Sequence, residues 1–160
     1  MTLQRAFTLI ELMVVVAVIA ILATLAVPSM QDRIVRDQIV EAAKLADLAK
    51  APIAAAWATT AILPADNAAA GLPVADKIVA NHVSSLSVEN GAIHLSFGNR
   101  ANAAIKGKTL SLRPGVVDDA PVVPVAWVCA AAPAPRKMTL RGTDRTDVPA
   151  RFLPLNCRAG

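Results

Sequence analysis

Residues 7–28 read FTLIELMVVVAVIAILATLAVP, and this stretch decides how the rest of the chain is organised. Between residues 12 and 27 only Thr24 is polar, and Glu11 carries the single charge of the stretch. As a helix that rises about 1.5 Å per residue, residues 7–27 would be about 31 Å long, which matches the hydrocarbon core of one membrane. The stretch therefore predicts a helix that can cross a membrane.

Glu11 needs an explanation, because a carboxylate inside an apolar span costs about 3 kcal/mol to insert and normally has a partner. The leader MTLQRA supplies only Arg5 as a cation. Cleavage between Ala6 and Phe7 would create an α-amine, on this chain or on a neighbour, as the counter-charge. The alternative is that Glu11 lies at the headgroup boundary and stays hydrated, since the insertion cost is smallest near a helix end. The position of Glu11 leaves both interpretations open.

These residues resemble the class III signal of type IV pilins and their relatives. The resemblance rests on the short basic leader, the sequence FTLIE, the long apolar run and Pro28. It implies that a prepilin peptidase cuts before Phe7 and methylates the new amine. It also implies that Glu11 helps to register subunits during filament assembly. Ala6 stands where members of the family nearly always have Gly.

A second apolar pattern follows Pro28 and has the three- and four-residue spacing of one helix face. Its members are Val35, Ile39, Ala42, Ala46, Ala49, Ile53 and Trp57. Opposite charges four residues apart support a helix in water on the other face. We therefore expect one helix from Phe7 to about Thr60. Pro28 and Pro52 should kink it, because proline removes a backbone donor and crowds the preceding turn.

An antiparallel sheet is expected to cover the apolar face of that helix. Four stretches have alternating apolar residues, namely 83–89, 93–97, 110–112 and 125–129. Asn90-Gly91 between the first two is a strong type I′ hairpin signal, and residues 113–115 (RPG) should end the third strand. The expected fold is α+β, a long N-terminal helix packed on a four-stranded antiparallel sheet with a C-terminal disulfide loop.

The pattern also predicts where the segments of the chain begin and end. The expected segments are the cleaved leader (1–6), the transmembrane or filament-core half of the helix (7–28), its amphipathic half (29–60), a connecting loop (61–81), the sheet (82–130) and a basic loop bounded by the disulfide (131–160).

Cys129 and Cys157 are the only cysteines, and they do not form a CxxC motif. They are not spaced with His82 or His94 as metal ligands, so no metal site is expected. An exported chain reaches an oxidising space, where a lone pair of cysteines usually forms a disulfide. Closing this loop would stabilise the fold by about 3–4 kcal/mol.

The formal net charge of +4 comes from the C-terminal part of the chain. One interpretation is a solvated loop, and the other is a polyanion-binding patch. The patch would consist of Arg136, Lys137, Arg141, Arg145 and Arg151. Aromatic residues make up only 3% of the chain, which argues against a surface that stacks on bases. The chain has no nucleophile elbow, phosphate-binding loop or catalytic carboxylate pair, so we expect neither an enzyme nor a cofactor.

The resemblance extends to NHVSSLSVENGAIHLSF, AAIKGKTLSLRP, AWVC and LPLNCR, which are similar to the strands and disulfide loop of type IVa pilins. It implies a structural subunit that is held in the bacterial inner membrane as a precursor. The subunit is then polymerised into an extracellular filament for adhesion, twitching motility or DNA uptake. The implied partners are identical subunits, the prepilin peptidase, the pilus assembly machinery, and DNA or host-surface receptors. The alternatives are a minor pilin that binds DNA through the basic loop, a secretion-system pseudopilin, and an ordinary bitopic membrane protein. The cysteine pair weighs against a pseudopilin.

Overall fold

The computed structural model describes residues 8–159, and within this range it leaves the side chains of residues 25–29 undescribed. Ala6 and Phe7, the expected cleavage site, lie outside the described residues. The chain divides into two compact units, Met1–Ile34 and Val35–Gly160. The first is helical over its described part from Leu9, and the second contains the sheet.

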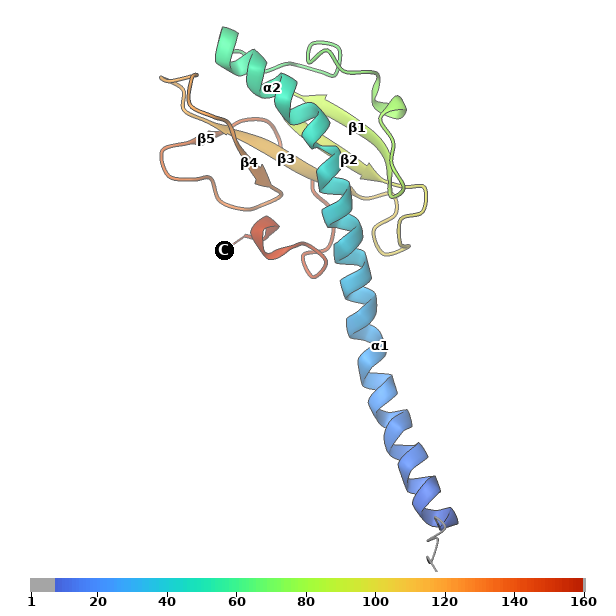
Figure 1. The fold of residues 1–160 in the computed structure, drawn as a ribbon. Coiled ribbons are helices and arrows are strands. Elements are labelled where there is room, and N and C mark those ends of the chain that lie inside the picture. The colour runs from blue at the N-terminus through green and yellow to red at the C-terminus, as the bar shows by residue number, and fades with distance from the viewer. Residues whose placement is uncertain (1–7, 160) are drawn as a thin grey trace, which may run out of the picture. The chain divides into compact units, whose positions relative to one another are not determined.

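Two helices take the place of the single helix that the sequence predicted. They are α1 (Leu9–Leu45) and α2 (Asp47–Thr60), shown in Figure 1. The helical backbone continues through Pro28 and Pro52, and the interruption lies instead at Ala46. Here the Ala46 carbonyl accepts N–H groups from both Ala49 (2.9 Å) and Lys50 (3.0 Å), as in a locally tightened turn. The interruption at Ala46 was not predicted, and the kinks at the two prolines remain predictions.

Within the part of the chain that the structure describes, no helix combines the length and the apolar character needed to span a membrane.

The sheet contains the four predicted antiparallel strands in the order β1-β2-β3-β4, with a fifth strand paired to β3. The strands are β1 (Val83–Glu89), β2 (Ala92–Phe97), β3 (Thr109–Val116), β4 (Ala126–Cys129) and β5 (Thr139–Leu140). The turn between β1 and β2 has positive φ at Asn90 (49°) and Gly91 (81°), as a type I′ hairpin requires. The α+β fold is therefore confirmed, and β5 was not predicted.

The third strand is longer than predicted, because it continues through Pro114 to Val116. The pairing of β3 with β2 ends at Leu112, and its pairing with β5 begins at Gly115. Pro114 lies where the neighbouring strand changes, so its missing backbone donor is tolerated. The Pro114 carbonyl still accepts a hydrogen bond from the Arg141 N–H at 2.9 Å.

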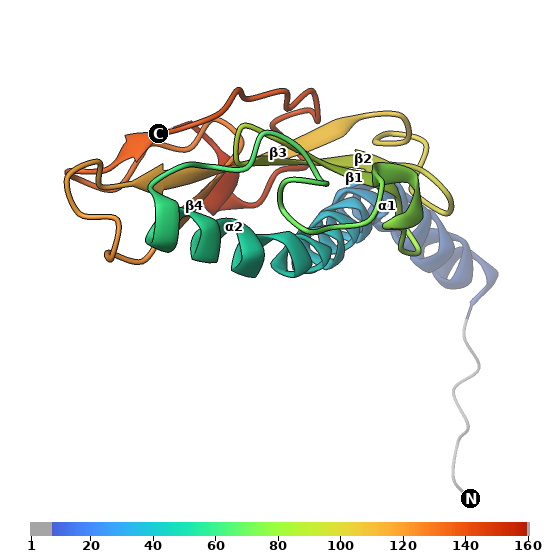
Figure 2. The same cartoon turned by 90° about the horizontal axis from the view of Figure 1, so that it is seen from above.

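The main core lies between the amphipathic helix face and one face of the sheet, and Figure 2 shows α2 lying against that face. All seven residues of the predicted helix stripe are buried. On the sheet, Leu86 faces Leu95 and Val88 faces Ile93 across the first hairpin. Because these four side chains share one face of the pleat, burying the helix stripe buries them as well.

Candidate functional site: the apolar helix and the disulfide-bounded loop

The first part of α1 presents apolar side chains on every side. The large apolar residues between Leu9 and Leu22 are between 48% and 76% exposed. Thr24, the polar residue of this run, donates its hydroxyl hydrogen to the Ile21 carbonyl at 2.7 Å, so its polar group is satisfied within the helix. A continuous apolar surface of this kind normally marks contact with lipid or with other protein.

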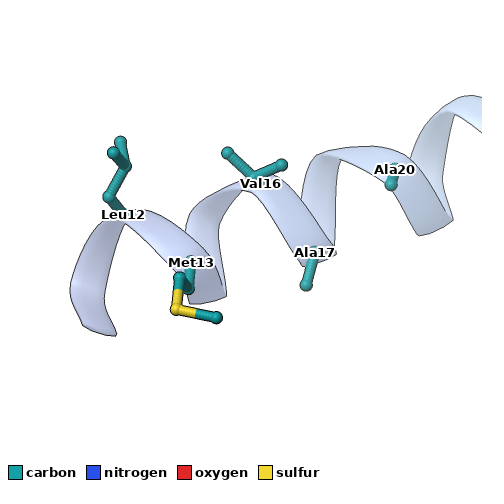
Figure 3. Close-up of a pocket in the computed structure, with 5 residues that line it drawn as sticks. All are labelled: Leu12, Met13, Val16, Ala17 and Ala20. Carbon is teal, nitrogen blue, oxygen red and sulfur yellow. The ribbon is translucent and has the colours of Figure 1, made fainter. Parts of the chain in front are cut away.

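Small residues hollow one part of this surface. Figure 3 shows bulky Leu12, Met13 and Val16 beside Ala17 and Ala20, which together line a shallow apolar depression. Small side chains in a helix surface allow a second helix to approach closely. The depression is therefore suited to helix packing and contains no polar group that would bind a small ligand.

Glu11 lies in the first turn of α1, and its N–H donates to the Thr8 hydroxyl oxygen at 3.3 Å. Thr8 and Glu11 form the Thr-x-x-Glu pattern of a capping box, a signal in the sequence that could have revealed the role of Thr8. The Glu11 side chain is exposed and has no ion-pair partner within residues 8–159. The assembly role of Glu11 remains a prediction.

The predicted disulfide between Cys129 and Cys157 is confirmed, with the two Cα atoms 4.7 Å apart. It joins the end of β4 to the short 3₁₀ helix η2 (Leu155–Cys157), and both cysteines are buried. The loop that it closes also supplies buried side chains of its own to the core, from Val148, Phe152 and Leu153. The disulfide therefore stabilises a loop that already packs on the domain.

Part of this loop crosses the second face of the sheet. A Cβ atom on Gly142 would lie 2.5 Å from the Ala92 Cβ, so only glycine allows the chain to pass this closely. The Arg145 N–H donates to the Ser111 hydroxyl oxygen at 2.9 Å, and the Ser111 N–H donates to the Thr146 hydroxyl oxygen at 3.0 Å. These contacts bury polar residues of the sheet that the sequence alone would place in solvent.

A polar cluster lies beneath the crossing segment. His94 Nδ1 is 2.9 Å from the Ser111 hydroxyl oxygen, its Nε2 is 3.6 Å from the Glu89 carboxylate, and Glu89 also pairs with Arg145. Burial lowers the pKa of His94, as does the Arg145 charge, whereas Glu89 and Asp144 oppose the shift. Ser111 is fully buried and cannot meet a substrate. We interpret the cluster as a structural contact that fastens the loop.

The basic residues of the loop do not form one free patch. The Arg141 guanidinium lies 2.7 Å from the Asp118 carboxylate, and its hydrogen bond is the main reason why the pKa of Asp118 is lowered. Arg145 pairs with Glu89, and the Arg151 guanidinium lies 4.5 Å from the centre of the Phe152 ring. Arg136 and Lys137 are exposed and have no ion pair within the described part of the chain. Binding of a polyanion by these residues remains a prediction.

Comparisons with known proteins agree with this architecture. Residues 35–158 match the family model described as pilin (bacterial filament), and residues 1–27 match the prokaryotic N-terminal methylation motif. The chain is 35% identical to the type IV major pilin protein PilE of Neisseria gonorrhoeae, over 98% of this chain and 95% of that protein. It is also 35% identical to a fimbrial protein of Neisseria meningitidis serogroup A (98% and 95%) and to the fimbrial protein EcpC of Eikenella corrodens (97% and 91%).

The family implies assembly of identical subunits, and the methylation motif implies a prepilin peptidase, a membrane precursor and an extracellular pilus. These implications fit a chain that combines an exposed apolar helix with a compact, disulfide-bonded domain. The chain therefore belongs to the type IV pilin family and is a structural subunit of a pilus, not an enzyme.

Proposed function

We propose that this chain is a major pilus subunit. In this proposal it is cut between Ala6 and Phe7, methylated at Phe7 and held in the bacterial inner membrane through residues 7–28. The pilus assembly machinery then polymerises it. The observation that carries the proposal is the exposed apolar surface of α1 between Leu9 and Thr24, where Glu11 is the only charged residue.

Polymerisation would move these apolar side chains from lipid to protein without exposing them to water. The apolar side chains thereby stay out of contact with water while the surroundings of the helix change. The depression over Ala17 and Ala20 would let helices of neighbouring subunits approach closely. Packing between different surfaces of identical subunits gives an open filament instead of a closed oligomer.

Glu11 would meet the amine of Phe7 on a neighbouring subunit. A buried ion pair costs desolvation energy that offsets its attraction, so its main contribution is to registry and less to net stability. The hydrogen bond from the Glu11 N–H to Thr8 fixes where the helix begins and thus supports the position of the carboxylate.

Adhesion, twitching motility and DNA uptake are the roles that we propose for the filament, with surface receptors or DNA as further partners. The minor-pilin alternative gains no support from the charges, because Arg141 and Arg145 are already paired with carboxylates. The names of the similar proteins, type IV major pilin and fimbrial protein, favour the major subunit.

The substitution Glu11→Ala tests this proposal, with Asp37→Ala as a matched control that removes an exposed acid from the same helix. We expect the Glu11→Ala protein to be cleaved, folded, disulfide-bonded and resident in the membrane, but several-fold depleted from filaments. The measurement is the ratio of subunit in sheared filaments to subunit in the membrane pool. A ratio equal to that of the wild-type protein would refute the role of Glu11 and favour a hydrated carboxylate at the headgroup boundary.

A further inference from the structure

An exposed leucine lies in the short helix η2, near the C-terminal end of the unit Val35–Gly160. The Leu155 side chain is 83% exposed, although η2 is held by the buried Cys157 and its disulfide. A single exposed apolar side chain is ordinary on a protein surface. Leu155 is different because it projects from a short segment that is covalently fixed, so little conformational entropy would be lost when it binds.

Two guanidinium groups, those of Arg36 and Arg158, meet at the Arg151 carbonyl, in the segment that leads to Leu155. Arg36 donates two hydrogen bonds to the Arg151 carbonyl, at 3.0 and 2.8 Å. Arg158 donates to the Leu153 carbonyl at 3.0 Å and to the same Arg151 carbonyl at 3.3 Å. Their acceptors are neutral carbonyls, and neither arginine has a carboxylate partner among residues 8–159. This arginine cluster therefore retains its charge for an acidic partner.

A pocket with the complementary character lies at the C-terminal end of α2. Trp57, Ala61, Ile62 and Leu63 form its apolar wall, and Asp118 and Arg141 complete its lining. Ile62 is 70% exposed, so the pocket lacks a cover in the isolated subunit. The loop between β3 and β4 carries a second carboxylate next to Asp118, because the exposed Asp119 follows it directly. Because Arg141 neutralises Asp118, the exposed Asp119 supplies the net negative charge next to this pocket.

The leucine and the pocket lie at opposite ends of the same unit. Within the unit Val35–Gly160, Arg36 lies at the start of the helical part, and its hydrogen bond holds the segment that leads to Leu155 there. The pocket lies at the other end of the helical part, where α2 ends at Thr60. The helical run from Arg36 to Thr60 covers about 36 Å at about 1.5 Å per residue. Figure 1 agrees, since the red segment near the C-terminus and the far end of α2 lie at opposite ends of the sheet-containing unit.

We propose that Leu155 of one subunit inserts into the Trp57–Ile62–Leu63 pocket of a second copy of this chain, with the arginine cluster facing Asp119. The proposal rests on the proposed function as a pilus subunit and names a contact between its globular units. The two surfaces differ and lie at opposite ends, so the contact joins subunits head to tail and repeats along a filament. The opposite charges around it would fix the register.

Site-specific photo-crosslinking in assembled filaments tests the contact. Benzoylphenylalanine replaces Leu155 in one strain and, as a matched control, Val74 in another, since Val74 is also an exposed apolar residue. After irradiation of sheared filaments, we expect position 155 to form an inter-subunit adduct with the peptide that contains Ile62. Position 74 should not form that adduct. Inter-subunit adducts from position 155 that exclude this peptide, or none at all, would overturn the contact.

Charge reversal gives a second, independent test. Arg158→Glu should lower the filament fraction several-fold, and Asp119→Arg in the same chain should restore it at least in part. Leu155→Asp should lower the fraction, whereas Leu155→Met should not. Disulfide formation in the membrane pool shows that each variant is folded. If these variants assemble like the wild-type protein, the contact is wrong. If the unmodified chain forms no filaments at all, the proposed function itself fails.

Discussion

Removal of the disulfide gives a stability prediction whose size follows from the length of the closed loop. The double substitution Cys129→Ala and Cys157→Ala opens a link between residues that are 28 positions apart. In the chain-entropy treatment, a loop of this length contributes about 3.6 kcal/mol by restricting the unfolded chain. An entropy of unfolding of about 2.1 cal/mol/K per residue converts this loss into a decrease in melting temperature of about 14 °C for the unit Val35–Gly160.

The native structure of the loop should nevertheless survive at room temperature. Val148, Phe152 and Leu153 remain in the core without the disulfide, and two hydrogen bonds from Arg36 still hold the Arg151 carbonyl. We therefore expect an unchanged circular dichroism spectrum at 25 °C and a much lower melting temperature. An unchanged spectrum with a lower melting temperature would show that the disulfide acts by restricting the unfolded chain. A changed spectrum would instead show that native packing is lost.

The assay is a thermal melt of the mature subunit in detergent, followed by circular dichroism. Wild-type protein in reductant is the matched control, because it loses the same covalent link while keeping both sulfur atoms. A decrease of less than about 3 °C in both samples would refute the reasoning, since 3.6 kcal/mol is several times larger than that shift represents.

Two further predictions concern the interior of the domain. Ile53→Ala in α2 should lower the free energy of unfolding by about 2–5 kcal/mol in chemical denaturation, because Ile53 is fully buried in the core. Val40→Ala, at a 45% exposed position of α1, should cost far less. His94 has a lowered pKa in the folded domain and titrates near 6.5 when unfolded, so the stability linked to its neutral form is complete above pH 6.5 and decreases as the pH falls through the folded-state pKa. Denaturation at several pH values should show this slope, and a slope that is unchanged in His94→Gln would contradict it.

The helix stripe and the first hairpin could be predicted because each depends on a short-range rule. Residues from Val35 to Trp57 follow a helical period that only one buried face explains, and Asn90-Gly91 favours one turn type. The fifth strand could not be predicted in the same way. Thr139–Leu140 is only two residues long, and it forms a strand because the edge of β3 beyond the end of β2 offers hydrogen-bond partners.

The contacts of the charged and polar residues in the loop were also not predictable from the sequence. The pairing of Arg145 with Glu89 and of His94 with Ser111 joins positions that are far apart in the sequence. No local pattern in residues 141–147 indicates that this segment crosses the second face of the sheet, so counting the cations suggested more free charge than the folded loop presents. The break at Ala46 likewise coincides with a shared carbonyl, which the spacing of the apolar residues does not indicate.

The most direct test of the account is the intact mass of the subunit from sheared filaments. If the chain is a cleaved and methylated pilus subunit, filaments should contain residues 7–160 with one added methyl group on Phe7 and two hydrogens fewer for the Cys129–Cys157 disulfide. Fragmentation of the same ion should place the methyl group on the N-terminal residue. Filaments whose main subunit retains Met1, or sheared filaments that lack this chain altogether, would contradict the account.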